Sequence, residues 1–189
     1  MRYARLLVLV ACITSSASAQ RPAAFRPELR PFVGAFIPTG GLRSDFKTAT
    51  MLGGQAALEL SDYAHIVGTL AWTHGHNKFT SLSDDVTYIW QYDLGVELNT
   101  IQQLNENWLF RPFLGAGAGA RTYDYQAKAI GSQTCTAGYG ALGMELQREM
   151  IAFRIEGREY LSCFESPLSA KKVTRNDIGL AFGLAYHLR

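Results

Sequence analysis

After its first 19 residues the 189-residue sequence has no long apolar run, and none approaches the ~20 residues that a membrane-spanning helix requires. It also has no sustained i, i+3, i+4 pattern of apolar residues, so amphipathic helices are not expected. If the chain crosses a membrane, it must do so as a closed β-barrel, because an open sheet edge in lipid would leave backbone groups unpaired.

The sequence also lacks a marked excess of either charge. It contains 18 Lys and Arg residues and 16 Asp and Glu residues, and Arg2 and Arg5 both precede residue 20. Residues 20–189 therefore carry 16 groups of each sign. Nucleic-acid binding needs a basic surface, so no nucleic-acid partner is expected. The length allows one domain.

The first 19 residues have the three parts of a secretory signal peptide. Arg2 and Arg5 form the basic part, residues 6–13 the apolar part, and Ala17-Ser18-Ala19 the cleavage site. A lipoprotein-like sequence ending at Cys12 offers lipidation as an alternative, although the stretch before Cys12 is short for one. We predict a signal peptide at 1–19, a periplasmic N-terminal segment at 20–29 and a β-barrel domain at 30–189.

From Arg30 onward, apolar residues alternate with polar or small ones in segments of about ten residues, the period of a β-strand. The last segment is the clearest, with Ile178, Leu180, Phe182 and Leu184 on one face. The eight predicted strands are approximately 30–38, 52–61, 65–73, 86–99, 107–121, 135–147, 151–161 and 175–188. The first contains two prolines, and its faces are not assigned.

Short and long links alternate along the chain. The short links are approximately 62–64, 100–106 and 148–150, and the long ones 39–51, 74–85, 122–134 and 162–174. This asymmetry is typical of barrels with short turns on one side of a membrane and longer loops on the other. We therefore predict an all-β fold, an eight-stranded antiparallel up-and-down transmembrane β-barrel.

The alternation allows the apolar face to point outward into lipid, or inward around a ligand as in a soluble lipocalin-like barrel. Three observations favour the outward arrangement. The polar face is rich in Gly and Ala, as a narrow lumen requires, and the predicted strands contain no Lys. Its charges also nearly balance, as enclosed charges must. The predicted lumen charge network is Glu59, Asp93, Glu97, Arg111, Arg121, Glu145, Arg154, Glu156 and Arg158.

Aromatic residues near the strand ends supply the third observation. Following the chain up and down places them in two groups, as expected for girdles at the two membrane interfaces. The loop-side group is Trp72, Tyr88 and Trp90, and the turn-side group is Trp108, Phe110 and Tyr186.

On strand number, loop asymmetry and the final strand, residues 30–189 resemble the small outer-membrane β-barrel proteins. That family includes the membrane domain of outer membrane protein A and the outer membrane proteins X and W. Residues 179–188 resemble the signal recognised by the barrel-assembly machinery, although Leu188-Arg189 stands where the family has a terminal aromatic. The resemblance implies the bacterial outer membrane as location, with outer-membrane lipid and that machinery as partners.

Cys135 and Cys163 are the only cysteines after residue 19, and an exported chain meets an oxidising compartment. Both lie at the loop-side ends of strands that the 148–150 turn makes antiparallel neighbours. We predict a disulfide between them, with free thiols as the alternative. Strand parity gives the two residues opposite faces, so the bond requires a bulge or a relaxed loop.

No group of residues predicts catalysis, a cofactor or a metal. His74 and His76 could form half of a metal site, but no further ligand completes it. No His-Ser arrangement specifies a triad, and residues 115–120 lack the Lys-Ser/Thr of a phosphate-binding loop. We do not expect an enzyme, although lipid A modification, an activity of some small barrels, is an alternative.

The favoured function is a plugged barrel with four surface loops and a structural or adhesive role. Its unknown extracellular partner would bind through loop residues such as Phe46, Phe79, Tyr123 and Tyr125. Two alternatives are a narrow channel or carrier of small hydrophobic molecules, and a soluble periplasmic binding barrel.

Overall fold

The computed structural model describes residues 26–78, 86–127, 131–165 and 172–187. The predicted signal peptide, Cys12, Phe79 and the terminal Leu188-Arg189 pair lie outside them. The described elements are a short 3₁₀ helix, η1 (Gly40–Ser44), and nine strands: β1 (Pro27–Pro38), β2 (Ala49–Ser61), β3 (Ala64–His76), β4 (Val86–Asn99), β5 (Gln102–Asn105), β6 (Trp108–Tyr125), β7 (Gln133–Arg148), β8 (Ile151–Glu165) and β9 (Lys172–His187).

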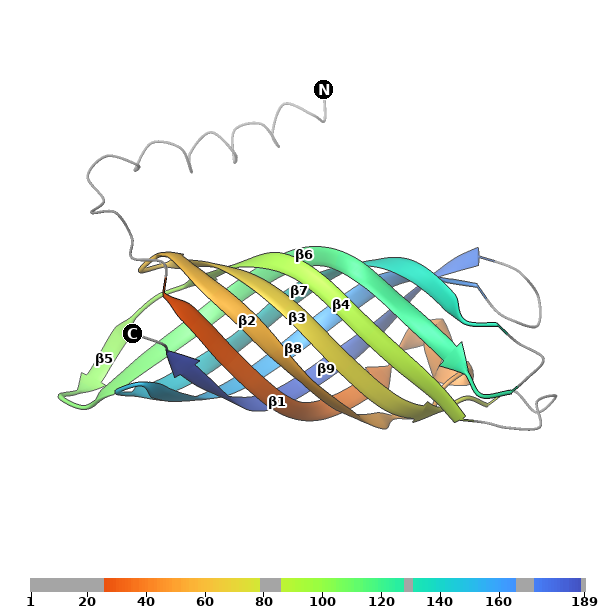
Figure 1. Cartoon of the computed structure of the whole chain (residues 1–189), viewed down its shortest axis with the longest axis horizontal. Helices are drawn as coiled ribbons and strands as arrows, with labels where there is room; N and C mark the ends of the chain where they lie inside the picture. Colours follow the sequence, from red (N-terminus) through yellow and green to blue (C-terminus); the bar gives the residue numbers. More distant parts are fainter. Residues whose placement is uncertain (1–25, 79–85, 128–130, 166–171, 188–189) are drawn as a thin grey trace, which may run out of the picture.

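Eight of these strands close into a barrel, which confirms the predicted all-β fold (Figure 1). Each strand is antiparallel to its neighbours, β1 pairs with β9, and the β4–β6 pairing completes the ring. In the described residues, no helix is long and apolar enough to cross a membrane. The start of β1 and the end of β9 lie at one end of the barrel, which we call the turn side; the opposite end is the loop side.

Several strand bounds differ from the sequence-based expectation, and two of the differences lie on the turn side. The barrel wall begins at Pro27, three residues before the predicted boundary, because β1 pairs with β2 from Pro27↔Leu58 onward. The 100–106 link, expected to be a simple turn, contains β5, which pairs only with the start of β6. β5 thus extends a hairpin beyond the turn-side rim without joining the ring.

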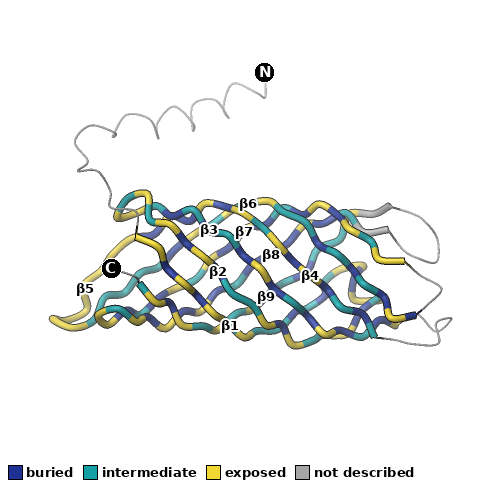
Figure 2. The backbone as a smooth tube through the Cα atoms, viewed as in Figure 1, coloured by how far each residue is buried: buried dark blue, intermediate teal, exposed yellow. Residues whose placement is uncertain are grey.

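Burial alternates along most of the barrel strands, so the wall has two chemically different faces (Figure 2). On β8, Arg154, Glu156 and Arg158 are buried, whereas Phe153 and Ile155 are exposed. The same alternation exposes large apolar side chains all around the barrel, among them Leu70, Leu94, Leu114, Leu142, Phe153 and Phe182. A water-soluble protein rarely exposes so large an apolar surface, whereas the hydrocarbon of a bilayer favours it.

Glycine keeps the lumen wide enough for one large ring. Tyr139, on β7, points into the lumen against β4 and β6. A Cβ on Gly117 would lie 2.6 Å from Cε1 of that ring, and one on Gly95 would lie 2.9 Å from its Cζ. The Gly-Ala alternation at 115–120 therefore belongs to a strand whose lumen-facing positions leave room for Tyr139.

Candidate functional site

The centre of the lumen is organised around Arg154, which is 5% exposed. Its Nη2 lies 2.5 Å from Oε2 of Glu97 on β4, and its Nη1 lies 3.2 Å from Oε2 of Glu145 on β7. Nη2 also donates to Oε2 of Glu156 at 2.8 Å, and the guanidinium lies over the ring of Phe113. Four residues of the predicted charge network, from three strands, thus meet at one point.

Arg158 forms the next layer toward the loop side. It donates to Asp93 Oδ1 at 2.9 Å and pairs with Glu156, while its guanidinium lies over the Tyr139 ring. The Tyr160 hydroxyl donates to Asp93 Oδ2 at 3.1 Å. The layer links β4, β7 and β8 across the barrel.

Arg121 and Asp177 form a third, fully enclosed layer. The two side chains are ion-paired, with 1% and 0% of their surfaces exposed. Arg121 also donates to Gln91 Oε1 at 2.8 Å, and its guanidinium lies over the Tyr160 ring. Asp177 was not included in the predicted network.

Apolar residues form a buried cluster at the loop-side end of the lumen, above these layers. The β1–β2 link, including η1, folds inward, and its Leu42 and Phe46 pack with strand residues in the cap, a cluster of Phe36, Leu42, Phe46, Ile89, Tyr123 and Tyr125. Two contacts fix the position of this link. One is an isolated β-bridge between the backbones of Phe46 and Asn77, and the other is an ion pair between Arg175 and Asp45 at 3.1 Å.

The cap corrects one sequence-based expectation. Phe46, Tyr123 and Tyr125 were expected to be exposed for partner binding, but they are 1%, 0% and 4% exposed. Tyr123 and Tyr125 belong to β6, which runs four residues beyond its predicted end, and they continue the lumen-facing series of Arg121.

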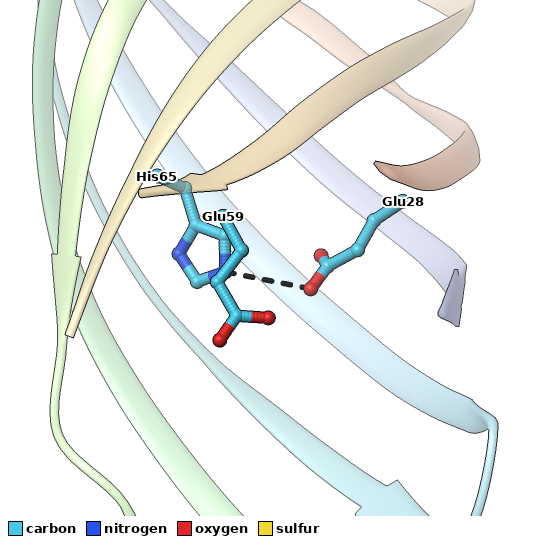
Figure 3. Close-up of side chains that lie close together, drawn as sticks. All are labelled: Glu28, Glu59 and His65. Carbon is cyan, nitrogen blue, oxygen red and sulfur yellow. Dashed lines mark ion pairs between the residues drawn. The ribbon is translucent and has the colours of Figure 1, made fainter. Parts of the chain in front are cut away.

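A second polar cluster occupies the turn-side end of the lumen (Figure 3). Glu28 accepts a bond from Arg30 Nη2 at 2.6 Å, while His65 Nε2 and His187 Nδ1 lie 3.4 and 2.7 Å from its other oxygen. The Asn99 side chain lies 3.0 Å from His65 Nδ1. None of these residues was in the predicted network. Glu28 precedes the predicted barrel, β1 had no assigned faces, and the network contained only Asp, Glu and Arg residues, which leaves out His65, Asn99 and His187.

Two members of the predicted charge network, Glu59 and Arg111, do not take part in the ion pairs described above. Glu59 lies directly opposite His65 in the β2–β3 register, and Arg111 lies opposite Glu145 in the β6–β7 register. Within the described part of the chain, neither forms an ion pair. Glu59 instead lies in the turn-side cluster beside Glu28 and His65.

The residues of the predicted aromatic girdles lie near the two rims. On the loop side, the Trp72 ring lies 5.8 Å from Tyr88 and 6.5 Å from Trp90. His74 and His76 extend this outward-facing group along β3, with the His74 ring 5.3 Å from Tyr88. On the turn side, Trp108, Phe110 and Tyr186 lie near the ends of β6 and β9.

Cys135 and Cys163 are not joined by a disulfide in the structure. The β7–β8 register sets Ala137 opposite Ser162, so strand parity turns Cys135 toward the lumen and Cys163 away from it. Cys163 Sγ contacts the Thr136 hydroxyl at 3.7 Å instead. The bulge that a disulfide between them would require does not occur at this point of the wall.

A barrel with enclosed, paired charges and an apolar exterior is a transmembrane β-barrel. No protein-family model matches the chain, and no curated protein sequence does. Solved structures do resemble it, and they include small barrels of bacterial outer membranes. The predicted resemblance to that class is therefore confirmed for the fold, and these neighbours support the predicted outer-membrane location.

Three of these structures cover most of the chain. OprG of Pseudomonas aeruginosa has a TM-score of 0.58 at 15% identity, covering 88% of this chain and 97% of its own. Neisserial surface protein A has a TM-score of 0.54 at 10% identity, and the match covers 85% of this chain and 96% of that protein. Ail, the attachment invasion locus protein of Yersinia pestis, has a TM-score of 0.51 at 13% identity, and the match covers 87% of this chain and 99% of that protein.

Proposed function

We propose that this protein is a non-enzymatic barrel of the bacterial outer membrane, sealed along its axis, that stabilises the envelope and attaches to partners through its loop side. The observation that carries the proposal is the series of side-chain layers packed one above another along the lumen. The Arg154, Arg158 and Arg121 layers follow one another from the centre to the loop side, and the cap closes that end.

The space between these layers is small. Two cavities beside Gln55 and Glu156 have volumes of about 10 Å³ each. That is about the space that one water molecule needs. A channel or carrier of small molecules requires a continuous path, and the enclosed guanidinium–carboxylate pairs make such a path costly to open.

Planar-bilayer recording tests the seal. We expect the inserted protein to give no conductance, or only rare and small openings, because ions would have to displace the Arg154 and Arg121 layers. Insertion is checked on the same sample by the difference in gel mobility between unboiled and boiled protein. Stable, regular single-channel steps would contradict the seal and favour the channel hypothesis.

A basic hollow on the loop side supports the attachment role. It has a volume of about 530 Å³, and its lining includes Arg43, Lys47 and Lys78 beside Thr39 and Phe46. Such a surface suits a sulfated or otherwise anionic polymer. Ail has been solved in complex with the heparin analogue sucrose octasulfate, at 14% identity and a TM-score of 0.50 to this chain.

The attachment role predicts that heparin binds the folded barrel and that the R43Q/K47Q variant binds it less. We expect a loss of about fivefold to tenfold, because each exposed ion pair contributes about 0.2–1 kcal/mol. Arg148→Gln, which removes one positive charge on the turn side, is the control and should leave the affinity unchanged. An equal loss per removed charge in both variants would show that binding follows total charge and not this hollow.

A further inference from the structure

Three potential metal ligands from three consecutive strands converge at the turn-side end of the lumen. Glu28 on β1, Glu59 on β2 and His65 on β3 each bring one donor atom to within 4.8 Å of the others (Figure 3). Glu28 and His65 are both 1% exposed, whereas Glu59 is half-buried. The group lies outside the layers that seal the barrel.

Two of these donor atoms are buried and lie close together. Oε1 of Glu28 and Nε2 of His65 are 3.4 Å apart, and neither makes a well-aligned hydrogen bond among the described residues. His187 Nδ1 lies 2.7 Å from the same Glu28 oxygen, so a third nitrogen borders this space. An ion between Oε1 and Nε2 would give both atoms a ligand bond.

The charge of the lumen points to a cation. Between the turn-side end and the cap, lumen-facing strand positions carry seven carboxylates: Glu28, Glu59, Asp93, Glu97, Glu145, Glu156 and Asp177. The same positions carry five guanidinium groups: Arg30, Arg111, Arg121, Arg154 and Arg158. Two negative charges remain when both lumen histidines are neutral, and one remains when His187, which lies between Glu28 and Glu145, carries a proton. A cation bound here would compensate this excess.

We propose that Glu28, Glu59 and His65 bind a divalent transition-metal ion, with Zn²⁺ as the best match. Zn²⁺ takes His nitrogen and carboxylate oxygen together at about 2.0–2.2 Å, so tetrahedral ligand atoms lie about 3.3 Å apart. The 3.4 Å between His65 Nε2 and Glu28 Oε1 fits that spacing. Ca²⁺ and Mg²⁺ prefer oxygen ligands alone, which the imidazole disfavours.

The surrounding residues orient the ligands as a metal site requires. Arg30 occupies Oε2 of Glu28, and the ion would share Oε1, which has two lone pairs, with His187 Nδ1 at 2.7 Å. Ligation through His65 Nε2 puts the imidazole proton on Nδ1, which lies 3.0 Å from the amide nitrogen Nδ2 of Asn99. Two donors cannot share this contact, so the Asn99 amide would flip and its oxygen, which otherwise has no partner among the described residues, would accept the proton.

Such an ion would tie β1, β2 and β3 together where the barrel starts. Because Glu59 is only half-buried, the ion can enter from the turn side. The inferred role is structural, and it goes beyond the proposed function: a sealed barrel can attach to partners without the ion. Its failure would therefore leave the proposed function in place.

Zn²⁺ titration of untagged, folded barrel, first stripped with a chelator, tests the proposal. We expect one Zn²⁺ per chain and a weakening by more than about tenfold in Glu59→Gln, because a ligand should matter at least as much as a residue that orients one. Glu59→Gln is the primary variant because the side chain is half-buried and nearly isosteric. His65→Gln should abolish binding at the concentrations that saturate the parent.

The double variant H74A/H76A is the matched control, since these histidines face outward near the loop side and should not affect binding. Zn²⁺ should also raise the resistance to urea unfolding of the parent and the control, but not of Glu59→Gln. The proposal is overturned by absent Zn²⁺ binding, by unchanged affinity in Glu59→Gln, or by loss of binding in H74A/H76A. The gel-mobility shift shows that each variant is folded.

Discussion

Replacing Arg154 by methionine is expected to lower the free energy of unfolding by about 3–5 kcal/mol, the usual effect of removing one partner from a buried ion-pair group. The loss would leave Glu97, Glu145 and Glu156 enclosed with less positive charge. Arg30 and Arg158 pair with Glu97 and Glu156, but among the described residues the only other ion-pair partner of Glu145 is His187, at 3.4 Å. Urea titration of the folded barrel in detergent measures the change.

Arg148→Met is the matched control. Arg148 lies at the exposed turn-side end of β7, with its guanidinium 5.7 Å from the Trp108 ring. Surface substitutions of this kind usually change stability by less than about 0.5 kcal/mol. The double variant R154M/E97Q should recover part of the lost free energy of unfolding, because it removes one of the carboxylates that Arg154 no longer pairs with. Similar stabilities for R154M and R148M would contradict an enclosed charge network.

The second large effect is expected on the opposite face of the same strand. Ile155 is 46% exposed and lies midway along the outward series from Ile151 to Leu161. An arginine near the bilayer midplane of a membrane barrel costs about 2–4 kcal/mol. We therefore expect Ile155→Arg to reduce strongly the fraction of chains that fold into the outer membrane, as measured by fractionation and unboiled gel mobility.

Ile155→Leu is the control for this substitution, and it should assemble as the parent does. If the exterior faced water, an exposed arginine would be accommodated with little change in stability. Normal assembly of Ile155→Arg would thus show that this face does not contact lipid.

The sequence predicted the fold well where polar and apolar residues alternate without interruption. On β8 and β9 this alternation is set by the chemistry on the two sides of the wall, so Arg154, Glu156 and Arg158 could be assigned to the lumen without a structure. β1 has no such regularity: Pro31 and Pro38 interrupt it, and β1 begins before the predicted boundary. Consequently Glu28 and Arg30 were missed, and with them the turn-side cluster.

The cap was missed for a different reason. Phe46 lies in a long link, where aromatic residues are usually taken as exposed, and only its contacts with distant strands bury it. Tyr123 is 77 positions further along the sequence, and no local pattern shows that the two rings lie 5.6 Å apart. Strand alternation predicts which face a residue occupies, but it does not predict how a loop folds back into the barrel.

The central claim, an inside-out barrel with its apolar face in lipid, is tested most directly by fractionating cells that express the unmodified chain. We expect the protein to stay with the outer membrane through high-salt and alkaline washes, and to run at different positions on a gel before and after boiling. Release into the soluble periplasmic fraction, with one mobility before and after boiling, would contradict the claim.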